Sequence, residues 1–443
     1  SWLSFERFFR NSKIKKICLP KKLSKLGNFW CKGAKELVEV NVDPRNKCFS
    51  VKDGFLVRDS TDEYEILFPS ETEKLEEVFL EQEKPLKLSD FCFSNSKNLS
   101  NVRISCNELE TSSSCFSRCS SFKLFEIIKS TSVNLHLETF KECKSLEIIS
   151  FNYLPVITIK EDHFISCKEN LKTISFNEIE EVIVDKNAFK EFNHLEKIIF
   201  TNIKKIGFGD NCFYNCQSLS ILLLDCEQDI AINENTFCCC TSLKEITLKT
   251  KSKLIIPDNF MLDSNQLQTV IMSGGNVEIG DFCFKNCDSL KSFTITESGK
   301  IIIGESEFIN CTSLLRITIK SDNKSQVIFG NNCFSGAVNL IDFNLEKCEV
   351  TINNNCFESC KSLKKLSIIE MSKISIAENQ LVGLDSLQNV VLKSKSEINI
   401  GQNCFSESPK LETVEFIGSE ISIASNCFTQ KVDKNDHKPF KIS

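Results

Sequence analysis

Cysteine is the residue type whose spacing in this chain most resembles a site for chemistry. The 443 residues include 24 cysteines but only four histidines. Most of the cysteines occupy two recurring positions that lie four residues apart. The first position holds Cys92, Cys115, Cys212, Cys283, Cys333, Cys356, Cys404 and Cys427. The second holds Cys119, Cys143, Cys167, Cys216, Cys240, Cys287, Cys311 and Cys360. Where both positions are filled, the C-x-x-x-C spacing lies within the range that zinc sites use.

Three interpretations of these cysteines are open. A zinc site would have to be a Cys₄ site, because the histidines are so few. Disulfides could join neighbouring repeats, because stacked strands lie about 4.8 Å apart, within the Cα separation that a disulfide bridges. Free thiols could instead pack inside the protein as small apolar groups. We favour the third interpretation, because two fixed positions of one repeat explain the spacing without a metal or a bridge.

The other reactive residue types do not converge. His136, His163, His194 and His437 fall in different parts of the chain and share no repeat position. The sequence also lacks the phosphate-binding, nucleophile-elbow, zinc-protease and dinucleotide motifs. Because catalysis needs a converging set of acid, base or nucleophile groups, we predict no catalytic residue, no cofactor and no metal. The sequence therefore predicts a protein that is not an enzyme.

A repeat of about 24 residues must position all of these groups. Its anchor is an aromatic residue, replaced once by leucine, and successive anchors are 23 to 26 residues apart. The anchors are Phe93, Phe116, Phe140, Phe164, Phe189, Phe213, Phe237, Phe260, Phe284, Phe308, Phe334, Phe357, Leu381, Phe405 and Phe428. Six residues after most anchors stands a leucine or phenylalanine, followed by apolar residues three and five positions further on, as in Leu314, Ile317 and Ile319. A second alternating piece, such as residues 301–304, precedes the next anchor, often with a glycine that we interpret as a turn residue (Gly280, Gly304, Gly330 and Gly401).

Each unit therefore predicts a strand, a turn, a second strand and a coil that carries the anchor. Periods of 20 to 29 residues with an L-x-x-L-x-L core are typical of leucine-rich-repeat solenoids. We predict an α/β-type repeat solenoid dominated by strands, a right-handed superhelix with a curved, mostly parallel sheet. Stacking of the anchors in a ladder explains why 36 phenylalanines accompany only three tyrosines.

The domain organisation follows the register of the repeat. Residues 1–42 read as N-terminal repeats that begin near Phe8, and residues 75–428 as the main array. Between them, 43–74 breaks the period and carries a "KDG" turn between apolar runs, which predicts an inserted hairpin. Residues 429–443 are a charged tail or the start of a further repeat. No polar cap precedes the first repeat, so we expect the chain to belong to a longer protein.

The repeated phrases F-x-x-C-x-S-L-x-x-I-x-I and I-x-I-G-x-x-x-F resemble the BspA-like (treponemal-type) leucine-rich repeat family. The inserted "VNVDPRNKCFSVKDGFLV" resembles an irregular unit common in that family. Departures are local, with Phe192, Asp263 and Ala337 in place of the repeat cysteine. The resemblance covers essentially the whole chain and implies a surface antigen that binds host extracellular proteins or other cells.

Charge and hydropathy exclude two other classes of protein. The net charge is −6, with 54 basic and 60 acidic residues interspersed, so no basic field indicates a nucleic-acid partner. The sequence contains no stretch of 18 apolar residues, which a membrane-spanning helix would need.

The residue between the two apolar positions of each first strand should point outward, onto the open face of the sheet. This position runs from Arg103 to Glu415 along the array. We predict a protein-binding strip on the concave face at Ile199, Leu223, Thr247, Ile271, Thr294 and Thr318. The alternative is that these residues are simply good strand formers.

The sequence and the resemblance together favour a cell-surface or secreted adhesin that binds a protein ligand. Asn98, Asn310 and Asn323 begin glycosylation sequons that would matter in that setting. The alternative is an intracellular leucine-rich-repeat scaffold in the cytoplasm, which free thiols would favour.

Overall fold

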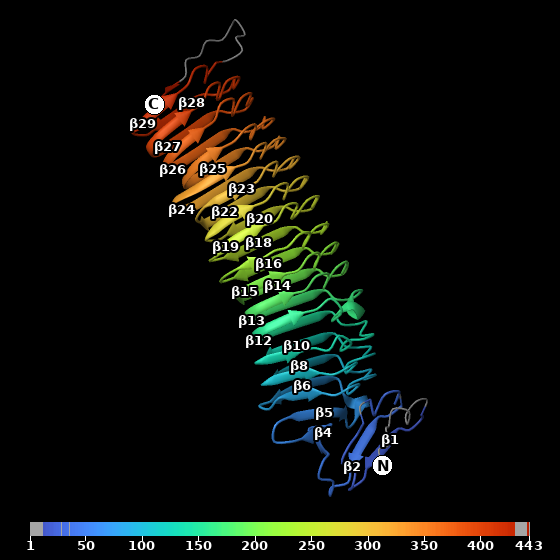
Figure 1. The fold of residues 1–443 in the computed structure, drawn as a ribbon. Coiled ribbons are helices and arrows are strands. Elements are labelled where there is room, and N and C mark those ends of the chain that lie inside the picture. Colours follow the sequence, from blue (N-terminus) through green and yellow to red (C-terminus); the bar gives the residue numbers. More distant parts are fainter. Residues whose placement is uncertain (1–11, 28, 35, 430–440, 443) are drawn as a thin grey trace. The chain divides into compact units, whose positions relative to one another are not determined.

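The protein is a strand-dominated leucine-rich-repeat solenoid with a spacing of about 24 residues, which confirms the predicted fold class. The computed structural model describes residues 12–27, 29–34, 36–429 and 441–442. The chain divides into two compact units, Ser1–Ile203 (unit 1) and Lys204–Ser443 (unit 2). In each unit the strands stack in the order of the sequence (Figure 1). Phe8 lies outside the described residues.

Helices are nearly absent from the described residues. The described residues contain only the short 3₁₀ helices η2 (Thr72–Lys74) and η3 (Ile165–Cys167). No described helix is long and apolar enough to cross a membrane. Turns fill most of the side of each repeat that carries the anchor.

Unit 1 contains three sets of parallel strands and an antiparallel insertion. Its strands are β1 (Lys16–Leu19), β2 (Glu39–Val42), β3 (Ser50–Lys52), β4 (Phe55–Asp59), β5 (Tyr64–Pro69), β6 (Glu77–Gln82), β7 (Leu86–Leu88), β8 (Asn101–Cys106), β9 (Glu108–Thr111), β10 (Leu124–Lys129), β11 (Ser132–Asn134), β12 (Ile148–Ile159), β13 (Thr173–Val184) and β14 (Lys197–Ile203). The first strands of the repeats pair in the parallel order β6, β8, β10, β12, β13, β14. Antiparallel pairing joins β3 to β4 and β4 to β5.

Unit 2 repeats the same plan without an insertion. Its strands are β15 (Lys205–Phe208), β16 (Ile221–Cys226), β17 (Ile230–Ala231), β18 (Glu245–Thr250), β19 (Lys253–Ile256), β20 (Thr269–Ser273), β21 (Asn276–Ile279), β22 (Ser292–Ser298), β23 (Ile301–Ile303), β24 (Arg316–Phe329), β25 (Asp342–Ile352), β26 (Lys365–Ile376), β27 (Asn389–Ile400), β28 (Thr413–Ile417), β29 (Glu420–Ile423) and β30 (Lys441–Ile442). All pairings between these strands are parallel. In β24 to β27 one continuous strand covers both the first and the second strand of the repeat.

Alternation of apolar and polar residues sets the register of the sheet. In β16, Leu222 and Leu224 are buried and Leu223 between them is half-buried on the other face. Leu222 pairs with Ile246, which pairs with Val270, so each repeat presents the same position to its neighbours. Since the side-chain period of a strand is two, a slip of one residue would expose the whole apolar set.

The anchors form ladders of buried rings inside each unit. In unit 1, Phe93, Phe116, Phe140, Phe164 and Phe189 stack with centroid distances of 5.1, 5.9, 5.2 and 6.0 Å. In unit 2, Phe284, Phe308, Phe334 and Phe357 stack at 5.7, 5.3 and 5.3 Å. The predicted anchor at Phe260 needs correction, because Met261 makes the anchor's backbone bond to Cys283. Phe260 is still buried and meets Phe237 edge-on.

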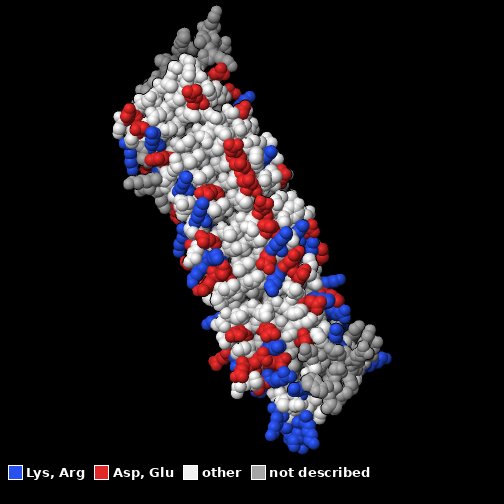
Figure 2. Space-filling view, in the orientation of Figure 1, with Lys and Arg blue, Asp and Glu red and all other residues white. Residues whose placement is uncertain are grey.

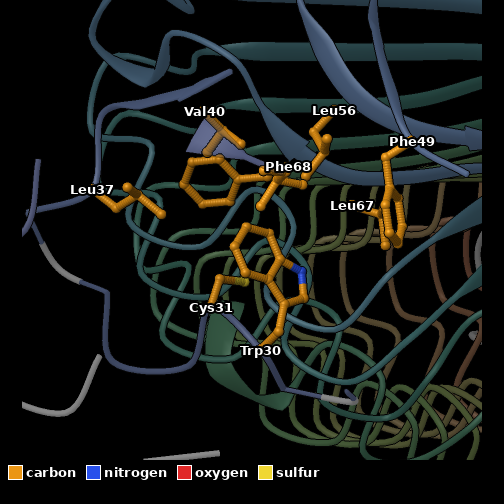
Figure 3. Close-up of a cluster of buried hydrophobic side chains, with 9 residues drawn as sticks. Trp30, Cys31, Leu37, Val40, Phe49, Leu56, Leu67 and Phe68 are labelled. Carbon is orange, nitrogen blue, oxygen red and sulfur yellow. The ribbon is translucent and has the colours of Figure 1, made fainter. Parts of the chain in front are cut away.

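A separate cluster of buried side chains fills the N-terminal part of unit 1. Trp30 meets Phe68 edge-on with a centroid distance of 5.8 Å, and Val40, Leu56 and Leu67 pack around them (Figure 3). These residues come from β2, from the antiparallel strands β4 and β5, and from the turn before β2. The insertion therefore contributes to the core.

Candidate protein-binding face

The predicted strip in unit 2 is a continuous column of side chains on five adjacent strands. Leu223, Thr247, Ile271, Thr294 and Thr318 pair directly with one another in that order. Ile271 is 37% exposed and the other four are half-buried. Because the flanking residues of each strand are buried on the opposite side, the column lies on the open face of the sheet.

Beyond Thr318 the same column becomes more polar. It continues through Asn344, Ser367, Val391 and Glu415. Ion pairs between adjacent strands flank it there, with Arg316 3.5 Å from Asp342 and Lys320 3.3 Å from Glu346. Along the column the apolar section from Leu223 to Ile271 therefore gives way, past two threonines, to a polar and charged section.

Ile199 lies in unit 1, at the end of that unit's own column. It pairs with Ser175, which pairs with Ser150, and the two serine hydroxyls lie 3.0 Å apart. Further along, Arg103 donates a hydrogen bond to Glu126 at 3.1 Å. The column of unit 1 is therefore mostly polar, with its side chains bonded to one another.

Phe79 on β6 is an outward residue that sequence reasoning missed. It is 60% exposed and pairs with Arg103 at the start of the unit 1 column. Val78 and Leu80 flank it with the usual alternation, so the same pattern that gave the other positions could have found it.

Charged side chains of both signs occur on the visible face. Figure 2 shows Lys and Arg beside Asp and Glu over much of it, wide uncharged areas, and one unbroken row of Asp and Glu. This distribution agrees with the small net charge of −6.

The family of the chain follows from a match along most of its length. Residues 67–191, 125–230, 157–274, 208–328 and 302–434 match the family model described as BspA type leucine rich repeat region, in six copies. The chain belongs to the BspA-type leucine-rich repeat family. The family predicted from the repeated phrases is thereby confirmed.

Several solved structures are similar to this BspA-type protein. A leucine-rich repeat protein from Bacteroides ovatus has 20% sequence identity, covers 82% of this chain and 94% of that one, and gives a TM-score of 0.32. A leucine rich cell surface protein from Faecalibacterium prausnitzii has 15% identity, coverages of 84% and 95%, and a TM-score of 0.21. The Toll–Spatzle complex of Drosophila has 13% identity, coverages of 88% and 70%, and a TM-score of 0.40. No curated protein matches the chain.

The two recurring cysteine positions of the BspA-type repeat face the interior, as we expected. Thiols of the second position donate to the anchor carbonyl of the preceding repeat. Cys119, Cys143 and Cys311 reach Phe93, Phe116 and Phe284 at 3.1, 2.8 and 3.0 Å. Thiols of the first position also bond to the preceding repeat, as Cys356 does with the Gly330 carbonyl at 3.0 Å. Burial raises the pKa of the Cys143 thiol to about 12, so it is a neutral donor at physiological pH.

The structure does not gather the histidines into a site. The His136 and His163 rings each accept a backbone N–H of their own turn, from Glu138 at 3.1 Å and from Lys160 at 3.2 Å. Burial lowers the pKa of His163 to about 4, whereas His194 is exposed, 3.9 Å from Glu169. His437 lies outside the described residues. Among residues 12–27, 29–34, 36–429 and 441–442, no group of three His, Cys, Asp or Glu is arranged to hold a metal ion.

Glu307 is the one acidic residue that takes the first cysteine position among the predicted anchors. It is fully buried, and its Oε2 accepts the Cys283 N–H at 3.1 Å. Gln380 occupies the same position beside Leu381 and accepts the Cys356 N–H at 3.4 Å. Burial raises the pKa of Glu307 well above its ordinary value of 4.5. The folded protein therefore holds this carboxyl in its neutral form.

We expect Glu307→Gln to stabilise the protein at neutral pH and to have little effect at pH 4. Below the unfolded-state pKa of about 4.3, Glu307 is protonated in both the folded and the unfolded chain, and its contribution to stability is fully present. As the pH rises toward the folded-state pKa, the unfolded chain gains free energy by ionising this carboxyl, and the contribution is lost. Glutamine keeps the hydrogen-bond acceptor, as Gln380 shows, but cannot ionise in the unfolded chain. Urea denaturation from pH 4 to pH 8 measures the difference. A variant whose advantage did not grow with pH would contradict the neutral, buried carboxyl.

Proposed function

We propose that this chain is a non-enzymatic protein-binding protein of the cell surface or the extracellular space, of the adhesin type. The observation that carries the proposal is the in-register column of Leu223, Thr247, Ile271, Thr294 and Thr318 on the open sheet face of unit 2. Membership of the BspA-type family supports the extracellular setting.

A protein partner could cover this column with little loss of favourable solvation. Five strands at about 4.8 Å spacing make a strip about 19 Å long. Leu223 and Ile271 supply apolar contact, and burying them releases water. The threonine hydroxyls between and beyond them can bond to a partner's backbone. No charged side chain stands within this section of the column, so the centre of a contact would bury no charge. Glu245 and Lys249, two residues to either side of Thr247 on the same strand, would lie at its border.

Replacing Leu223 and Ile271 together by serine should weaken partner binding at least about tenfold, because central apolar anchors dominate the affinity of an interface. Both side chains point away from the core, so the variant should fold normally. The measurement is binding of the full chain to a panel of purified, immobilised extracellular matrix proteins. Ile255→Ser is the matched control, because Ile255 is 49% exposed but lies on β19, in the second strand of its repeat.

Ile199→Ser, in the polar column of unit 1, tests separately whether that predicted residue contributes. Equal binding by wild type and the Leu223/Ile271 double variant would remove the strip from the proposal. Residues 43–69, which include the β3–β4 hairpin, would then be the next surface to test.

An intracellular scaffold for protein assembly is the second candidate. The buried thiols that donate hydrogen bonds to backbone carbonyls favour it, because reduced thiols persist in the cytosol. Titration of unreduced, denatured protein separates the two settings. Nearly all 24 thiols reactive would favour the scaffold, and extensive pairing or a glycan on the exposed Asn98 would favour the surface.

A further inference from the structure

A cavity of about 750 Å³ opens on the turn side of unit 1, away from the strands of the sheet. Four segments line it, within residues 29–33, 91–95, 113–118 and 138–142. Its volume lies within the range of small-molecule sites. The turns of the repeat form a similar hollow around Leu381 in unit 2, but that hollow is not lined by a pair of phenylalanines and a lysine.

Two phenylalanines in strained backbone positions form one wall. Phe29 and Phe91 have φ angles of 58° and 59°, and their half-buried rings meet edge-on at 5.8 Å. Phe91 stands two residues before its anchor, where the repeats of Asn187, Asn211 and Asn235 place asparagine with the same left-handed backbone. Asparagine tolerates this conformation, whereas a bulky residue pays a steric penalty. Because Phe282 has the same φ in its own repeat, the pairing of the two rings, and not the backbone angle, distinguishes this wall.

The other lining residues form a wall of hydroxyl groups and paired charges. The Ser94 and Ser117 hydroxyls lie 2.8 Å apart, and Ser113 donates to Glu138 at 2.9 Å. Arg118 binds Glu142 through two nitrogens, at 2.9 and 3.1 Å. The wall thus mixes donors with acceptors, which suits a ligand whose own hydroxyls both donate and accept.

Lys32 places a cation over the two aromatic rings. Its Nζ lies 5.1 Å from the centre of the Phe29 ring and 5.7 Å from that of Phe91. Within residues 12–27, 29–34, 36–429 and 441–442, no carboxylate forms a salt bridge with it. The other two cations of the cavity, Arg118 and Lys141, are already paired with Glu142 and Glu138. Lys32 is therefore the cation open to an anionic group of a ligand.

We propose that this cavity binds an acidic sugar, a pyranose that carries a carboxylate. The apolar face of the sugar ring packs on Phe91, its hydroxyls bond to the serine and glutamate wall, and its carboxylate meets Lys32. An aromatic surface, a mixed polar wall and one open cation together match this ligand better than an acidic peptide, which would use fewer of the hydroxyls. The site is independent of the strip on the sheet face.

The probes are glucuronic acid and N-acetylneuraminic acid, with glucose as the neutral comparison, added to the full chain. Saturation-transfer NMR should detect at least one acidic sugar with a dissociation constant of about a millimolar. Glucose should bind at least about tenfold more weakly, and Lys32→Gln should abolish that preference, because the carboxylate loses its partner.

Phe91→Asn is the decisive variant, since it installs the residue that other repeats use at this position. We expect acidic-sugar binding to fall at least about tenfold. Because the Phe91 ring also packs against the Trp30 cluster, a circular-dichroism spectrum must first show that the variant is folded. Phe282→Asn is the matched control, because Phe282 has a φ of 58°, lies two residues before its anchor and has Lys285 Nζ 5.1 Å from its ring. That variant should bind normally. The proposal is overturned if Phe91→Asn binds like wild type, if glucose binds as well as the acids, or if only an acidic peptide binds.

Discussion

Phe284→Ala should lower the free energy of unfolding of its part of unit 2 by about 3–5 kcal/mol. Phe284 is fully buried, stacks on Phe308 at 5.7 Å and meets Phe293 edge-on at 5.6 Å. Removing the ring leaves a cavity between repeats. The cavity cannot collapse, because backbone hydrogen bonds between neighbouring strands hold the repeats in place. In a repeat protein each unit depends on contacts with its neighbours, so the loss should be felt locally.

Native-state hydrogen exchange, resolved to the amides of β22 and β24, measures this local effect. Phe282→Ala is the control, because that ring is 36% exposed and lies two residues away in the same repeat. We expect Phe282→Ala to change the opening free energy by less than about 1 kcal/mol. Similar losses in both variants would show that the ladder of rings does not hold the repeats together.

Gly304→Ala should destabilise unit 2 by about 1–3 kcal/mol, which is the usual cost of forcing extra volume into a packed site. A Cβ at Gly304 would collide with the carbonyl oxygen of Gly280 in the preceding repeat. Gly330 has the same relation to Gly304, so these glycines let consecutive repeats approach closely. Each of these glycines stands directly between the second strand and the turn that follows it, so the close approach of the preceding repeat is a further reason for glycine at this position.

Gly207→Ala provides the comparison for Gly304. Gly207 lies within a second strand, β15, whereas Gly304 directly follows β23, and a Cβ at Gly207 would meet nothing within 4 Å. We expect Gly207→Ala to be neutral or slightly stabilising, because alanine restricts the unfolded chain. Urea denaturation of the two variants at one pH is sufficient. Equal stability of both would argue that the repeats can separate without loss.

The fold could be predicted because one physical pattern recurs in every repeat. Alternation at positions such as Ile317 and Ile319 fixes the face of each strand, and the spacing of the anchors fixes the stack. These signals are local in the sequence, so no long-range contact had to be guessed. The cysteine positions followed for the same reason, since they keep a constant offset from the anchor.

The features that escaped prediction depend on three-dimensional closeness or on backbone angles. Met261 takes the place expected of Phe260, because a one-residue shift of register leaves the apolar pattern unchanged. The cavity beside Phe91 joins segments that the insertion separates in sequence by almost 60 residues, as the contact of Cys31 with Phe91 also shows. The left-handed φ of Phe29 and Phe91 could not be predicted, because phenylalanine rarely adopts it. The asparagines at this position in other repeats do favour that conformation.

The central claim is that a partner binds the open sheet face of unit 2. Hydroxyl-radical footprinting of the full chain, with and without a matrix protein that binds it, tests this claim most directly. We predict that the partner protects Leu223 and Ile271 from oxidation and leaves the exposed Ile255 and Phe282 unchanged. Protection of Ile255 or Phe282 with Leu223 and Ile271 still reactive would contradict the claim, as would a panel in which no extracellular protein binds.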